Sequence, residues 1–117
     1  MTTTTCTHDQ AISHAHGYLA GTGLRVLDRS WQSPDGQLDI VAADRHAVVC
    51  DVRTRPRTRN MAPLGTVSQA RISRLRRLAV AWLDAHGTRS GQIRIDTVAV
   101  TCDGTGGYTI EHVKAVG

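Results

Sequence analysis

Two short alternating segments, separated by three residues, constrain the fold of this chain more than any other feature. Residues 36–43 (GQLDIVAA) and 47–53 (AVVCDVR) both read as strands, because successive strand residues point to opposite faces of a sheet. Asp51 and Arg53 therefore share one face, and the apolar residues beside them share the other. A β-hairpin with charged groups on one side is the first structural prediction.

The length of the hairpin loop decides whether Asp39 meets Asp51. A three-residue loop pairs Ala43 with Ala47 and sets the two carboxylates opposite each other, with their Cβ atoms about 5 Å apart. A two-residue loop shifts the register by one and puts them on opposite faces. The first register gives two carboxylates beside an arginine, as a metal-assisted phosphodiester site requires. The alternative is that these charges are the solvated face of a half-covered sheet.

The length of 117 residues indicates a single domain, which we place at residues 8–117 after a disordered polar tail at 1–7. No apolar run approaches the roughly 18 residues needed to cross a bilayer, and the Thr-rich start lacks the features of a secretion signal. A cytoplasmic protein is therefore expected. Three cysteines, Cys6, Cys50 and Cys102, with no CxxC pair, predict reduced thiols.

The pattern along the chain predicts an α/β fold with the order α-β-β-β-α-β-β. The expected helices span 8–20 and 68–86, and the expected strands span 24–31, 36–43, 47–53, 93–101 and 108–113. The second helix can make a parallel crossover, which gives a mixed sheet of about five strands flanked by helices. Residues 54–64, with two prolines, are expected to form a basic loop.

Positive charge in this chain is carried almost entirely by arginine. The formal net charge is +4, and Lys114 is the one lysine beside thirteen arginines. Guanidinium groups match phosphate oxygens, so a polyanion partner is predicted. The candidate phosphate contacts lie in residues 53–77, a stretch that contains no Asp or Glu. They are Arg53, Arg55, Arg57, Arg59, Arg71 and Arg74.

Several short motifs resemble one family of small bacterial proteins. They are Gly36-Gln-Leu-Asp-Ile, Asp51-Val-Arg53, Ala15-x-x-Tyr18-Leu19, Arg71-x-x-Arg74-Leu75 and Arg94-Ile95-Asp96. In this order they resemble the YraN-like family, which is placed in the PD-(D/E)XK nuclease superfamily and is similar to archaeal Holliday junction resolvases. The resemblance implies a restriction-endonuclease-like fold acting on branched or structured DNA.

The chain departs from the family's catalytic pattern at four positions. Where family members with an intact site have a glutamate on the first helix, a Gly-Glu-x-Asp segment and Glu-x-Lys, this chain has Ile12, Gln37, Asp51 and Arg53, and only Asp39 is unchanged. The shorter Asp51 withdraws its oxygens by about one C–C bond, about 1.5 Å. A guanidinium stays charged at working pH and cannot exchange a proton as lysine can.

These departures favour a nucleic-acid-binding protein, with DNA as partner, whose nuclease site is degenerate. The alternative is an active endonuclease in which Asp39 and Asp51 hold Mg²⁺ or Mn²⁺, Gln37 assists through its amide oxygen, and Arg53 stabilises the phosphate. A third possibility is a protein interaction module that keeps only the fold. A homodimer would suit a two-fold branched substrate.

The sequence offers one other metal hypothesis, a zinc site. Cys6-x-His8 and His14-x-His16 have suitable residue types, but His14 and His16 are two apart on the expected helix and point to different sides. We therefore expect these histidines to lie on the helix surface.

Overall fold

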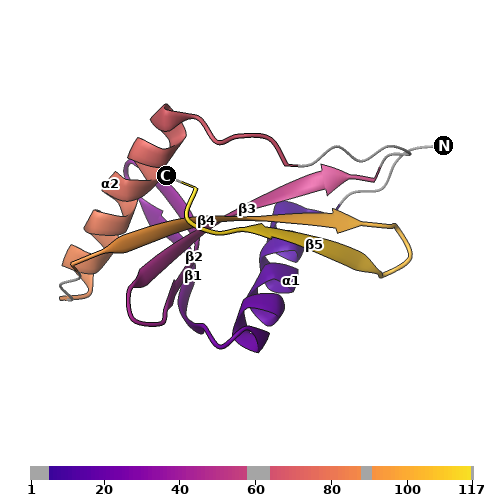
Figure 1. The fold of residues 1–117 in the computed structure, drawn as a ribbon, viewed down its shortest axis with the longest axis horizontal. Helices are drawn as coiled ribbons and strands as arrows, with labels where there is room; N and C mark the ends of the chain where they lie inside the picture. The colour runs from indigo at the N-terminus through magenta and orange to yellow at the C-terminus, as the bar shows by residue number, and fades with distance from the viewer. Residues whose placement is uncertain (1–5, 58–63, 88–90, 117) are drawn as a thin grey trace.

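The computed structural model describes residues 6–57, 64–87 and 91–116, which form one five-stranded sheet with a helix on each face (Figure 1). The elements follow the order α1 (His8–Gly21), β1 (Arg25–Ser33), β2 (Gly36–Ala43), β3 (Ala47–Pro56), α2 (Gln69–Ala85), β4 (Ile93–Cys102) and β5 (Tyr108–Val113). The predicted α/β class and the order α-β-β-β-α-β-β are confirmed. None of the helices in the described residues is long and apolar enough to span a bilayer.

Both helices begin at side-chain caps that the sequence encodes. The Thr7 hydroxyl accepts from the Gln10 N–H at 3.1 Å, and the Gln10 side chain accepts from the Thr7 N–H at 2.9 Å, so α1 starts at a capping box. Ser68 caps α2 by accepting from the Arg71 N–H at 3.2 Å. Residues 1–5 of the expected tail lie outside the described residues, whereas Cys6 is buried and Thr7 belongs to the helix cap.

The sheet has the strand order β1-β2-β3-β4-β5, and only β3 and β4 are parallel. Ala43 pairs with Ala47, which confirms the three-residue hairpin loop. The helix α2 supplies the crossover between β3 and β4. β3 continues to Pro56, so the first residues of the expected loop 54–64 extend the strand instead. They do so because β4 offers a parallel partner as far as Cys102.

The core has two layers because apolar side chains cover both faces of the sheet. On the α1 face, Ile12 and Leu19 pack with Val48 and Cys50, and on the α2 face a second group includes Val49. Asp51, which lies on the α2 side, has only 3% of its surface exposed. The alternative of a solvated strand face is therefore wrong for Asp51, since α2 covers the face from which it emerges.

One expectation about the cysteines is wrong. A disulfide joins Cys6 to Cys102, whose Cα atoms are 5.7 Å apart, and Cys50 is the free cysteine. Sequence spacing carried no sign of this pair, because 96 residues separate its members and only the folded sheet brings the start of α1 to the end of β4. Burial raises the pKa of the Cys50 thiol to about 12, so this third cysteine is a core residue.

Candidate functional site

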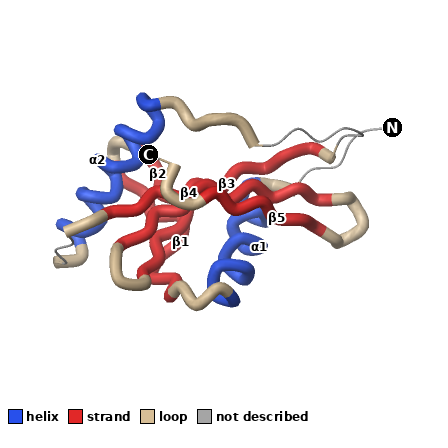
Figure 2. The backbone as a smooth tube through the Cα atoms, viewed as in Figure 1, coloured by secondary structure: helices blue, strands red, loops and turns tan. Residues whose placement is uncertain are grey.

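The candidate site lies where β2 and β3 separate, a place that we call the fork. The β2–β3 ladder runs from Ala43 and Ala47 to Ile40 and Cys50, and beyond this pair β3 continues beside β4 alone (Figure 2). Asp39 is the β2 residue directly before Ile40 of the last ladder pair, and its Oδ2 accepts from the Val52 N–H at 2.8 Å. The carboxylate thus replaces the backbone carbonyl that a continuing ladder would supply.

Asp51 is held at the fork by a guanidinium from the first turn of α2. Arg71 donates from Nε to Oδ2 and from Nη2 to Oδ1, both at 2.7 Å. Hydrogen bonding to this carboxylate raises the pKa of Arg71 above its ordinary value. Arg53 lies on the same side, with its Nε 3.7 Å from Asp51 Oδ2. Both oxygens of the buried carboxylate are therefore bound by a permanent cation.

Asp39 is surrounded by donors in the same way. His8 Nε2 lies 2.8 Å from Asp39 Oδ1, and the Gln37 amide nitrogen donates to the same oxygen at 3.1 Å. The Gln37 amide oxygen accepts from the Gln32 side chain. Metal ligation by Gln37 requires its oxygen beside Asp39, whereas the structure places its nitrogen there.

These side chains line a cavity of about 340 Å³ whose walls come from α1, β2, β3 and α2. The lining residues are His8, Gln37, Asp39, Asp51, Arg71, Arg74, Leu75 and Leu78. Five of the site residues predicted from the sequence thus meet in one place, namely Gln37, Asp39, Asp51, Arg71 and Arg74. Arg74 also contacts the turn between β1 and β2, where its Nη2 donates to the Asp35 carbonyl at 3.1 Å.

Ile12 does not take part in this site. It is fully buried among the residues between α1 and the sheet. His8, one turn earlier on α1, reaches Asp39 instead. Sequence reasoning placed His8 only in a zinc pattern and missed this contact. Its position as the first residue of the helix, directly after the capping Thr7, was the one local signal that its side chain lies at the start of the helix.

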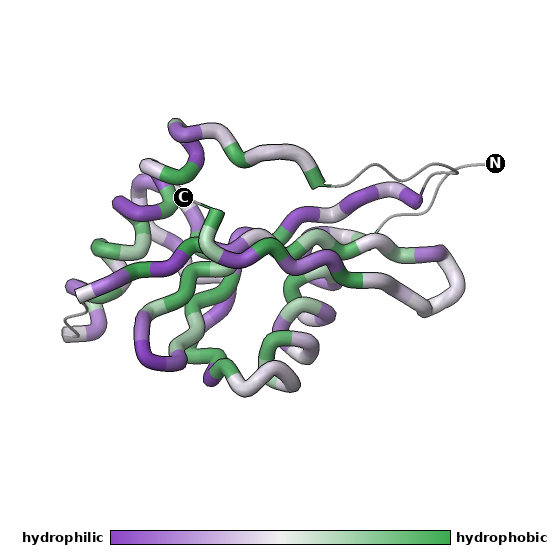
Figure 3. The backbone as a smooth tube through the Cα atoms, in the orientation of Figure 1, coloured by the Kyte–Doolittle hydropathy of each residue, from purple (hydrophilic) through white to green (hydrophobic). Residues whose placement is uncertain are grey.

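The remaining candidate arginines extend from the fork along β3 and α2. Arg55 Nη1 lies 3.2 Å from Glu111 Oε1 on β5, and Arg57 is exposed just after β3. Arg59 lies outside the described residues. Arg74 and Arg77 are exposed on α2. Figure 3 shows hydrophilic stretches along the outer half of β3 and along α2.

The described donor set at the fork does not fit a divalent cation as it stands. Mg²⁺ and Mn²⁺ require several free oxygen ligands, yet Asp51 is used by Arg71 and Asp39 by three donors. A cation there would also face Arg53 and Arg71 at close range. In the part of the chain that the structure describes, three side chains of types that can bind a metal lie together outside the fork cavity: His14 and the disulfide-bonded Cys6 and Cys102.

A second buried network joins β4, β5 and α1. Asp96 is fully buried and accepts from Arg94 Nε and Nη2, both at 3.0 Å, and from the Ala115 N–H at 3.0 Å. His112 Nε2 lies 2.8 Å from Asp96, and its Nδ1 lies 3.0 Å from the Tyr18 hydroxyl. Burial alone would raise the pKa of Asp96, but these hydrogen bonds outweigh it and lower the pKa. The motif Arg94-Ile95-Asp96 therefore has a structural role, since Asp96 connects β4 to β5 and to the segment that follows β5.

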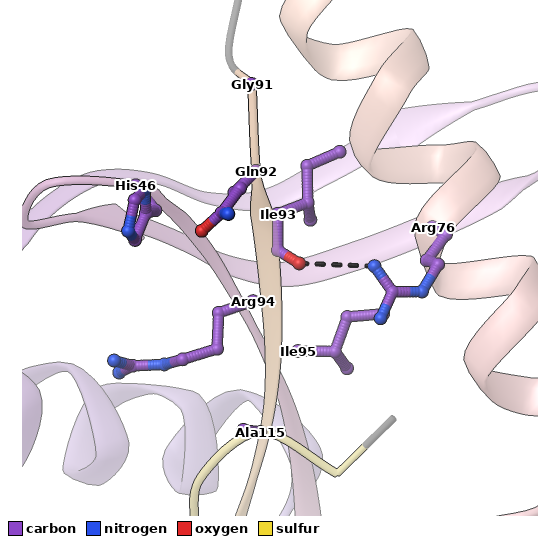
Figure 4. A pocket seen from close by; sticks show the side chains of 8 residues that line it. All are labelled: His46, Arg76, Gly91, Gln92, Ile93, Arg94, Ile95 and Ala115. Carbon is purple, nitrogen blue, oxygen red and sulfur yellow. Dashed lines mark hydrogen bonds between the residues drawn. The ribbon is translucent and has the colours of Figure 1, made fainter.

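Another cavity, of about 380 Å³, lies beside the start of β4 and contains several basic groups (Figure 4). Arg76 donates to the Ile93 carbonyl at 3.2 Å, while Arg94 is bound to Asp96. The two guanidinium groups point to opposite sides of β4 (Figure 4). Their charges do not converge on one ligand position, so this cavity is a weaker candidate than the fork.

Comparison with known proteins finds one family throughout. The family model described as "Uncharacterised protein family UPF0102" matches residues 13–100. A UPF0102 protein of Arthrobacter sp. (strain FB24) is 41% identical over 104 residues, which cover 88% of each chain. A UPF0102 protein of Beutenbergia cavernae is 40% identical over 101 residues, which cover 86% of each chain. That of Kineococcus radiotolerans is 41% identical over 100 residues, covering 84% of this chain and 82% of its own.

Proposed function

This chain belongs to the UPF0102 family, the YraN-like family that its sequence resembles, and from that premise we propose that it is a PD-(D/E)XK-type domain that binds branched or structured DNA without cutting it. Of the properties that the resolvase resemblance implies, we propose DNA binding for this chain and not DNA cleavage. It is supported above all by the bidentate pairing of Arg71 with Asp51, which puts a fixed guanidinium where a nuclease would need free carboxylate oxygens.

The charge at the fork favours a phosphate over a metal ion. Arg71 and Arg74 line the cavity with Asp39 and Asp51, and Arg53 lies 3.7 Å from Asp51, so three guanidinium groups meet two carboxylates. The side chains of Arg53 and Arg71 are 34% and 45% exposed, so both remain accessible from solvent. Guanidinium groups that already pair with a carboxylate have further N–H donors for a phosphate oxygen.

The exposed arginines around the fork would extend this contact along a DNA backbone. Arg57 follows β3, and Arg74 and Arg77 are exposed on α2. Arg55 contributes less, since it is paired with Glu111. Contacts of this kind position a nucleic acid but do not read its bases, so we expect structure preference with low sequence specificity.

Binding to a fluorescent four-way junction, followed by anisotropy at several salt concentrations, tests the proposal. Neutralising about five phosphates gives a slope of log K against log[salt] of about −4 to −5. Arg57→Ala and Arg74→Ala are each expected to weaken binding and to reduce the slope by about 1. Arg45→Ala is the matched control, because Arg45 is an exposed arginine in the hairpin loop away from the fork. A flat salt response, or equal losses in all three variants, would overturn the proposal.

The oligomeric state enters the same experiment. We propose that two copies bind one junction, because a four-way junction presents two equivalent halves to a protein pair. A titration under stoichiometric conditions gives the ratio of chains to junction directly, and a ratio of one would refute the two-copy form while leaving single-copy binding intact.

A further inference from the structure

Cys6, His14 and Cys102 form a cluster that the proposed function does not use. Their ligand atoms all lie within 4.8 Å of one another, and none of the three lines the fork cavity. Cys6 precedes the cap of α1, His14 lies in its second turn, and Cys102 ends β4. Three separate segments therefore bring two sulfurs and an imidazole to one point.

The surroundings fix the position of each group. Cys102 pairs with Tyr108 across the β4–β5 ladder, and the Tyr108 ring stacks on His14 with a centroid distance of 3.8 Å. The turn after Cys102 is closed by Asp103, which accepts from the Thr105 N–H at 2.8 Å and the Gly107 N–H at 3.1 Å. The imidazole and one sulfur are thus oriented before any ligand arrives.

The donor set points to a borderline-soft cation. Two thiolates and one imidazole are ligands that Zn²⁺ prefers, with Zn–S bonds of about 2.3 Å and Zn–N bonds of about 2.0 Å. Tetrahedral geometry then separates the two sulfurs by about 3.8 Å. Rotation of the two cysteine side chains from their bonded position supplies that separation, and water can complete the fourth position.

We propose that the reduced pair Cys6 and Cys102, together with His14, binds one Zn²⁺-class cation, and that the disulfide is the metal-free oxidised form of the same site. A disulfide-class oxidant such as oxidised glutathione converts one form to the other. The two thiolates lose two electrons and form the Cys6–Cys102 bond, the oxidant's S–S bond breaks to give two thiols after uptake of two protons, and the cation is released.

Cobalt binding to the reduced full chain tests this inference. Co²⁺ added to one equivalent without oxygen is expected to give thiolate-to-cobalt charge-transfer absorption, which one equivalent of Zn²⁺ abolishes. Cys102→Ser and His14→Ala should each weaken binding at least about 100-fold, since even loss of a second-shell partner costs 10–100-fold. His16→Ala and Cys50→Ala are the controls, because His16 contacts Arg29 and Cys50 is buried in the core.

A second readout separates a metal site from a disulfide alone. Oxidised glutathione added to the zinc-loaded chain should release one Zn²⁺ and form two glutathione thiols per chain. If Cys102→Ser fails to fold, His14→Ala still tests the metal site. This variant keeps both cysteines, and the His14 side chain that it removes is partly exposed in the native protein. The absence of charge-transfer absorption in the reduced protein, or its full retention in His14→Ala, would overturn the proposal. Because the cluster lies outside the fork, neither result bears on DNA binding.

Discussion

Replacing Arg71 by alanine is the perturbation that examines the fork most closely. It removes two hydrogen bonds of 2.7 Å from Asp51, a carboxylate with 3% of its surface exposed. Breaking a buried ion pair costs about 3–5 kcal/mol. Arg71 is 45% exposed, and Arg53 at 3.7 Å can move closer, so solvent and the second guanidinium reduce the expected cost to about 2 kcal/mol.

The assay is equilibrium unfolding in urea at pH 7, together with the melting temperature. A loss of about 2 kcal/mol corresponds to a decrease in Tm of about 6–10 °C for a domain of this size. Arg77→Ala is the matched control, since Arg77 is an exposed arginine on the same helix and should change stability by less than about 0.5 kcal/mol.

A double variant isolates the pair itself. Arg71→Ala combined with Asp51→Asn removes the uncompensated charge, so the double variant should be more stable than Arg71→Ala alone by about 1 kcal/mol. The reasoning is refuted if Arg71→Ala unfolds like Arg77→Ala, or if adding Asp51→Asn destabilises the protein further. Either result would mean that Arg71 does not neutralise Asp51.

Three further predictions concern the rest of the molecule. Asp96→Asn should destabilise the protein by about 2–3 kcal/mol at pH 7. The folded-state pKa of Asp96 is lowered, so the stability that its ionised carboxylate contributes is present above its unfolded pKa of about 3.9 and fades as the pH falls. Urea unfolding of the variant and the wild type should therefore differ less at pH 3 than at pH 7. Cys50 should resist a thiol reagent at pH 8 in the folded, reduced protein while Cys6 and Cys102 react, because burial raises its pKa to about 12; thiol titration before and after denaturation gives the count. Ile12→Glu should cost more than about 4 kcal/mol, against about 1 kcal/mol for Ile12→Val, as seen by unfolding, because the site is fully buried.

Each of these has a control and a contrary result. Asp84→Asn, at an exposed position, should be neutral at both pH values, and an equal loss for Asp96→Asn at pH 7 and pH 3 would contradict the linkage. Labelling of all three thiols at one rate would contradict the burial of Cys50. An Ile12→Glu protein that folds with little loss of stability would contradict the expected cost. In that case restoring Gln37→Glu, Asp51→Glu and Arg53→Lys with it becomes a fair test of recovered cleavage.

The central hairpin was predictable because its rules are local. Alternation fixes which side chains share a face, and a three-residue gap pairs Ala43 with Ala47. Asp39 and Asp51 line one cavity as expected, but they are not a ladder pair, because the β2–β3 ladder stops at Ile40 and Cys50. The helices were also predictable in extent, since Gly21 and Ser68 stand near their ends and the apolar spacing is helical. These signals act within a few residues of one another.

The partners of the two carboxylates could not be predicted in the same way. Arg71 is 20 residues from Asp51 and His8 is 31 residues from Asp39, and both contacts depend on how the helices cross the sheet. Arg71 was expected to contact phosphate, and nothing in its position along the chain indicated that a buried carboxylate would hold it. The disulfide of Cys6 with Cys102 was missed for the same reason, because its distance exists only in the folded sheet.

Incubation of a labelled four-way DNA junction with the protein and Mn²⁺ is the measurement that addresses the central proposal most directly. One half of each sample is run on a native gel to detect a complex, and the other on a denaturing gel to detect cut strands, with Asp39→Ala beside the wild type. Binding without catalysis predicts a retarded complex and uncut strands for the wild-type protein. Cut strands that disappear in Asp39→Ala would show a working metal-dependent nuclease and contradict the proposal, as would the absence of any complex.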